Sequence, residues 1–157
     1  MKTMTVTIDL FKQRPILFSA PMVRAILASK KTMTRRVFST RYLHLAVGDW
    51  LWVREKYRVA DGRPIYAADC SESEVKAHRG EWKPSMYMPH EFSRLMLEIT
   101  DIRAERLRSI SEEDAHKEGF DSVADFLKYF ESLSPKNRGE NPNVAVFSFK
   151  TVNPKQQ

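Results

Sequence analysis

The sequence has a single cysteine, Cys70, among its 157 residues, which excludes an internal disulfide and a zinc site built from cysteines. No apolar run approaches the roughly 20 residues of a membrane-spanning helix. Residues 1–15 lack the apolar core of a signal peptide, because Asp9, Lys12 and Arg14 interrupt them. The four histidines have no metal-ligand spacing. We therefore expect a cytoplasmic protein that uses no membrane, metal or cofactor.

The length and the composition are those of one soluble domain. The chain is 42% apolar and 29% charged, and its size is enough for a single core that buries roughly two thirds of the unfolded surface. Residues 1–60 contain 12 Lys or Arg and 3 Asp or Glu, whereas residues 61–157 contain 14 and 17. The basic half suggests a face that attracts the phosphates of nucleic acids or nucleotides; a solvated cationic surface is the alternative.

Hydrophobic periodicity predicts short strands mixed irregularly with short helices. The expected strands are 15–20, 31–38, 49–54, 65–68 (paired with 49–54), 93–107 with a bend near Asp101, and 144–149. Helices are expected at 21–29, 72–78 and 111–119. Asp121 is expected to cap a further helix, with a buried face of Val123, Phe126, Leu127 and Phe130. This order lacks βαβ alternation, so we expect an α+β fold, a small mixed β-barrel with short flanking helices.

The domain is expected to cover residues 15–152. An N-terminal arm or edge strand over 1–14 precedes it, and 153–157 form a tail. Within the domain, residues 70–92 form a long loop or insertion, since Gly80, Pro84 and Pro89 interrupt this segment.

One motif follows the first expected helix, in residues 28–36. It resembles the motif of the ASCH family of the PUA-like superfamily, in which a helix is followed by Gly-x-Lys-x-x-Glu-x-Arg. Lys31 and Arg36 match its lysine and arginine, whereas Ser29 replaces the glycine and Thr34 the glutamate. The pattern Lys-Thr-x-Thr-x-Arg of residues 31–36 is similar to that of bacterial N4-acetylcytidine amidohydrolases, which are ASCH proteins.

Further matches extend this resemblance. The turn at 47–49 is similar to the Gly-Asp turn of the family, and residues 111–118 resemble the helix that supplies the amidohydrolase glutamate, with Glu118 in its place. Residues 50–57, 82–85 and 88–89 resemble the larger phage and prophage branch of ASCH proteins. The resemblance implies a PUA-like barrel, and amidohydrolase or ribonuclease activity.

The residues that carry the resemblance have the chemistry for hydrolysis. Lys31, if desolvated or close to Arg35 and Arg36, has a lowered pKa and acts as a general base. Thr34 is then the nucleophile, and Glu118 orients the lysine or passes a proton to the leaving amine. The planar fork of Arg36 binds a carbonyl oxygen or a phosphate. Lys31 must lie in the turn before the strand, because in a regular strand it would point away from Thr34.

Aromatic residues and cations occur together between residues 50 and 87, a combination that stacks bases and neutralises phosphates. Trp50 and Trp52 share one strand face, and at least one of them is expected in the core. Trp82, beside Lys83 in a proline-rich segment, is the expected stacking platform. Ser148 on the last strand is expected to line the barrel mouth near the lysine.

The leading hypothesis is a hydrolase acting on RNA or on a modified nucleoside. Amide hydrolysis, as in an N4-acylcytidine amidohydrolase, needs a small closed pocket, whereas a ribonuclease needs an open basic groove and an activated 2′-hydroxyl. One alternative is a non-catalytic RNA or nucleotide reader, in which Lys31 and Arg36 contact phosphates and Trp82 stacks on a base; Arg35 is also expected to contact the ligand. A phage-encoded interaction protein is another. The sequence leaves the oligomeric state open.

Overall fold

The computed structural model describes residues 13–152. Its strands are β1 (Gln13–Leu17), β2 (Met33–Val37), β3 (Trp50–Arg54), β4 (Tyr57–Ala60), β5 (Arg63–Tyr66), β6 (Met96–Arg106) and β7 (Asn143–Val152). Its α-helices are α1 (Ala20–Leu27), α2 (Glu72–Ala77), α3 (Glu112–Lys117) and α4 (Val123–Leu133). Most of the expected N-terminal arm and the expected tail lie outside the described residues.

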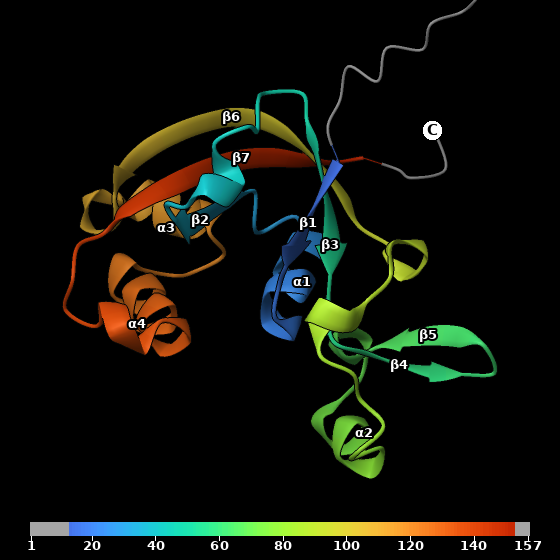
Figure 1. The fold of residues 1–157 in the computed structure, drawn as a ribbon. Helices are drawn as coiled ribbons and strands as arrows, with labels where there is room; N and C mark the ends of the chain where they lie inside the picture. The colour runs from blue at the N-terminus through green and yellow to red at the C-terminus, as the bar shows by residue number, and fades with distance from the viewer. Residues whose placement is uncertain (1–12, 153–157) are drawn as a thin grey trace, which may run out of the picture.

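Five of the described strands form one curved sheet in the order β1-β3-β6-β7-β2. β1 runs parallel to β3, and the other neighbours are antiparallel. The long strands β6 and β7 arch over the molecule, with α3 and α4 near one end and the β4–β5 hairpin and α2 toward the other (Figure 1). A β-bulge between Ile99 and Asp101 interrupts the register of β6, near the expected bend. The predicted α+β class is confirmed.

The edge strands β1 and β2 lie close to each other. The Arg36 guanidinium of β2 donates a hydrogen bond to the backbone oxygen of Leu17 in β1 at 2.8 Å. The sheet is curved, and a side chain bridges its two edge strands, which form no backbone pair among the described residues.

Two apolar clusters form the core. One packs the sheet against α1 and includes Val23, Leu51 and Phe147; the other lies under α3 and α4. Phe126 and Phe130 of α4 are buried in the second cluster, and Val123 and Leu127 pack against it, as their spacing predicts. The helix cap is Ser122 instead of the expected Asp121, since the Ser122 hydroxyl accepts a bond from the Asp125 amide at 3.1 Å.

The pairing expected for residues 65–68 is wrong. β5 pairs with β4, whereas β3 pairs with β1 and β6. The turn between β4 and β5 explains the difference, because Asp61 and Gly62 both have positive φ, at 52° and 76°. An Asp-Gly pair of this conformation closes a tight local hairpin, which leaves β3 free to pair elsewhere.

The expectation that a tryptophan of β3 enters the core is also wrong. Trp50 and Trp52 do share a face, but it is the half-buried face, and the alternate residues Leu51 and Val53 fill the core. Trp52 packs against the His90 ring with centroids 4.8 Å apart. The small aliphatic residues fit the interface with α1, so the bulky rings remain on the outer side.

Candidate functional site

A cavity of about 790 Å³ opens between the edge strands β1 and β2, α1 and α4. The charged residues among the described lining residues are five cations and one carboxylate: Lys31, Arg35, Arg36, Arg41, Lys56 and Glu118. The aromatic lining residues are Phe18, Tyr42, Phe120, Phe126, Tyr129 and Phe130. Its volume is that of a small-molecule site, and its lining suits an aromatic ligand that carries negative charge or carbonyl oxygens.

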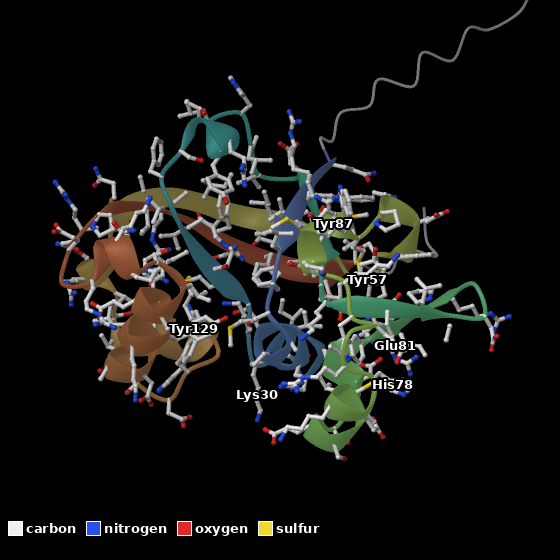
Figure 2. The ribbon with its side chains drawn as sticks, turned by 60° about the horizontal axis from the view of Figure 1, so that its bottom comes forward. Lys30, Tyr57, His78, Glu81, Tyr87 and Tyr129 are labelled. Carbon is white, nitrogen blue, oxygen red and sulfur yellow. The ribbon has the colours of Figure 1, made fainter. Side chains whose placement is uncertain are left out.

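Tyr129 belongs to the α4 wall of the cavity. It is labelled in Figure 2, and its hydroxyl lies 2.6 Å from the Ser19 hydroxyl at the start of α1. Ser19 occupies the capping position of α1 but makes no capping bond through its side chain. The contact instead joins the two helices that border the cavity.

The turn between α1 and β2 positions Lys31. Ser29 adopts a positive φ of 60° and redirects the chain after α1, and the Lys31 amide donates to the Ala25 oxygen at 3.1 Å. Lys31 therefore precedes β2, as the proposed chemistry requires, and only 3% of it is exposed. The neighbouring Lys30 is exposed and points outward (Figure 2).

The end of α3 packs against the same turn and delivers Glu118. The Lys117 oxygen accepts a bond from the Thr32 amide at 2.8 Å. Gly119 has a φ of 96°, and a Cβ atom there would lie 3.3 Å from the Ala25 Cβ and 3.5 Å from the Lys31 Cβ. A glycine thus ends α3 and permits the close approach of the two segments.

Gly119→Ala is expected to lower the free energy of unfolding by about 1–2 kcal/mol, the cost of placing a non-glycine residue in the left-handed region. Chemical denaturation measures this change. Gly139→Ala is the matched control for crowding: its φ is 75°, but a Cβ atom there meets nothing within 4 Å. Equal losses of stability in both variants would indicate that the close approach to the Ala25 Cβ atom imposes no additional cost.

Lys31, Glu118 and Arg35 form one buried ionic network. Lys31 Nζ donates to Glu118 Oε2 at 2.9 Å, to the Glu118 backbone oxygen at 3.0 Å and to the Met33 oxygen at 2.8 Å. Arg35 Nη1 donates to Glu118 Oε1 at 3.0 Å, and Nη2 contacts Glu105 and Asp114. Glu118 is 1% exposed, so each of its oxygens is held by a buried cation.

Burial lowers the pKa of Lys31, since desolvation penalises the ammonium; Glu118 acts in the opposite direction, and Arg36 and Arg35 add to the lowering. The balance favours proton loss by Lys31 compared with an ordinary surface lysine. A buried lysine of this kind is suited to proton transfer at the cavity wall.

Thr34 and Arg36 occupy alternate positions of β2, on one face of the strand, and both line the cavity. Thr34 is 3% exposed. The Arg36 guanidinium lies 4.8 Å from the centroid of the Phe18 ring, in addition to its bond to Leu17. The structure thus places Lys31, Thr34, Arg36 and Glu118 around one cavity.

Three expected ligand contacts lie elsewhere. Ser148 does not line the cavity; it pairs with Met33, and because opposed residues share a sheet face, it lies on the side away from Thr34. Trp82 and Lys83 are also absent from the described cavity lining. Trp82 is half-buried, with its indole nitrogen donating to the Val75 oxygen at 2.9 Å, and Lys83 is exposed.

The sequence did not point to several lining residues, namely Arg41, Tyr42, Phe120 and Tyr129. They come from separated segments and carry no common spacing, so only the tertiary fold brings them together. Among residues 13–152, no group of three or more His, Cys, Asp or Glu side chains could hold a metal ion. No helix in this part of the chain is long and apolar enough to cross a membrane.

Neither protein-family models nor curated proteins give a match to the sequence. The ASCH domain from Lactobacillus crispatus JV V101 is similar in structure, with a TM-score of 0.57 and 17% identity over 90% of this chain and 80% of that one. The hypothetical protein PH0355 matches with a TM-score of 0.54 and 12% identity, over 89% of this chain and 99% of that one. Protein EF3133 from Enterococcus faecalis V583, a DUF984 protein, matches with a TM-score of 0.52 and 11% identity, over 92% of this chain and 82% of that one. The motif in residues 28–36 and these structural likenesses agree, and the chain has the fold of an ASCH domain.

Proposed function

We propose that this ASCH-fold protein is a hydrolase that acts on RNA or on a modified nucleoside held in the cavity between β1, β2, α1 and α4. One observation carries the proposal: the buried pair Lys31–Glu118, the hydroxyl of Thr34 and the guanidinium of Arg36 border the same nucleoside-sized space. Its aromatic walls suit a base, and its cations suit a phosphate or a polarised carbonyl.

Amide hydrolysis on an N4-acylated cytidine uses Lys31, Thr34 and Arg36, and Glu118 orients the lysine through their hydrogen bond. Lys31, as the neutral amine, accepts the Thr34 hydroxyl proton while Thr34 Oγ attacks the acyl carbon. The carbon–nitrogen bond breaks, and the proton passes from Lys31 to the departing N4 nitrogen. Water then hydrolyses the threonine ester and regenerates the hydroxyl, while Arg36 donates hydrogen bonds to the oxyanion in both steps.

The size of the cavity, about 790 Å³, suits this chemistry. Its walls come from several elements, including the turn at Pro84 and Ser85 on the side of the 70–92 segment. A space bounded in this way fits a single base with its acyl group. RNA cleavage would instead need Lys31 to activate a ribose 2′-hydroxyl on a strand lying across the site.

A non-catalytic reader is the second candidate, and one observation favours it. The Lys31 ammonium has three acceptors within 3.0 Å, which is a full set for a protonated lysine. In a non-catalytic reader, this protonated lysine would stabilise the fold and contribute positive charge to the cavity, and Arg36 would contact the ligand.

The test is an incubation of the protein with a panel of N4-acylated cytidines and with single-stranded RNA, each with and without a chelator. We expect release of the acid and of cytidine from an acylated nucleoside, at the same rate with the chelator present. Saturable binding without product would support the reader. Neither binding nor turnover with any member of the panel would contradict both functions.

A further inference from the structure

A second hollow of about 610 Å³ lies beside the cavity, against α2. We call it the α2 groove; its described lining residues are Lys56, Val75, Lys76, Arg79, Gly80, Trp82 and Pro84. Lys56 and Pro84 also line the cavity. The two spaces therefore lie next to each other and share a wall formed by these two residues.

The α2 groove is cationic. Lys56, Lys76 and Arg79 are exposed, and within residues 13–152 none of the three forms an ion pair. Two nearby carboxylates are engaged elsewhere: Glu74 accepts a bond from the Ser71 amide at 3.1 Å, and Glu81 lies 2.7 Å from His78. Figure 2 shows His78 and Glu81 together beside α2. Three cations without paired carboxylates attract the phosphates of a polyanion.

The aromatic wall of the α2 groove is held in place. The Trp82 indole nitrogen donates to the Val75 oxygen, and the Arg58 guanidinium lies 5.6 Å from the centre of the ring. The backbone of Lys83 pairs with that of Tyr57, with the Lys83 amide 2.7 Å from the Tyr57 oxygen. The groove is therefore anchored to the β4–β5 hairpin, and a fixed ring beside cations is the arrangement that holds single-stranded nucleic acid.

We propose that the substrate is a nucleotide within single-stranded RNA, with the reacting base in the cavity and the flanking strand in the α2 groove. This inference rests on the proposed function and deepens it, because it selects an oligonucleotide over a free nucleoside. Lys56, on the shared wall, contacts the phosphate between the two sites. Lys76 and Arg79 contact the phosphates that follow.

The test compares the affinity for free N4-acetylcytidine with that for a single-stranded hexaribonucleotide containing one such base. The variant Lys76→Ala/Arg79→Ala removes two exposed cations of the α2 groove. Lys128→Ala/Arg138→Ala is the matched control, because both positions are exposed and line neither space. Calorimetry at several salt concentrations gives the affinities, and circular dichroism verifies that each variant is folded.

We expect the wild-type protein to bind the hexamer at least about tenfold more tightly than the nucleoside, equivalent to about 1.4 kcal/mol. In Lys76→Ala/Arg79→Ala the ratio of hexamer affinity to nucleoside affinity should fall. The slope of log affinity against log salt concentration, measured for the hexamer, should become shallower by about 1.4, because each phosphate that is no longer neutralised reduces this slope by about 0.7. The control should retain both values. An equal ratio of affinities in the two double variants would overturn the proposal that the α2 groove binds the flanking strand. Binding of the free nucleoside would in that case still support the cavity as the site of the base. Failure of the wild type to bind either probe would overturn the proposed function as well.

Discussion

Glu118→Ala is expected to lower the free energy of unfolding by about 3–5 kcal/mol, the usual cost of removing one partner from a buried ion pair. The substitution leaves Lys31 and Arg35 without the carboxylate that they share, and both cations are 3% exposed. Guanidinium denaturation, with the midpoint and the slope both measured, gives the change.

Glu113→Ala is the control for this prediction. Glu113 lies on the same helix and pairs with Lys117 at 3.4 Å, but its side chain is 80% exposed. Its removal should change the free energy of unfolding by less than about 1 kcal/mol, as for surface ion pairs in general. Similar effects of the two substitutions would contradict a stabilising role for the buried network.

Thr34→Val is expected to reduce turnover of an N4-acylated cytidine at least about a hundredfold, since it removes the attacking hydroxyl and preserves the shape of the side chain. Affinity for the nucleoside should stay within about tenfold, or about 1.4 kcal/mol. Thr34 is buried at the cavity wall, so valine fills the same space. Initial rates of cytidine release, measured with the affinity, separate the two effects.

Thr32→Val is the matched control, because Thr32 is exposed, precedes β2 and is not among the described lining residues. It should retain the wild-type rate. Thr34→Ser keeps a hydroxyl and should restore most of the activity, which distinguishes loss of the nucleophile from a change in packing. Wild-type turnover in Thr34→Val would exclude Thr34 as the nucleophile.

The local elements are predictable from the sequence. Helical spacing predicts α1 and the buried face of α4, and the serine at position 111 predicts the start of α3, where its hydroxyl accepts a bond from the Asp114 amide. The Asp61–Gly62 turn carries an equally local signal that indicates a hairpin between β4 and β5. The longer-range pairing expected for residues 65–68 neglects this signal, and it is wrong for that reason.

The candidate site is predictable only in part. Lys31 and Glu118 are 87 residues apart, and no spacing rule connects them; the family resemblance suggests the pair. The position expected for Ser148 is wrong because the side that a strand residue faces depends on its register with β2. Arg41 and Lys56 reach the cavity from separate segments, so their contribution depends on the curvature of the whole sheet.

The most direct measurement is a crystal structure of Thr34→Val bound to N4-acetylcytidine, since this variant should hold the substrate without consuming it. We expect the base against the aromatic wall of the cavity, the acyl carbon next to the side chain at position 34, and the acyl oxygen within hydrogen-bonding distance of Arg36. Lys31 and Glu118 should remain paired at the same wall. A nucleoside bound outside this cavity, or an empty cavity at saturating nucleoside, would contradict the account.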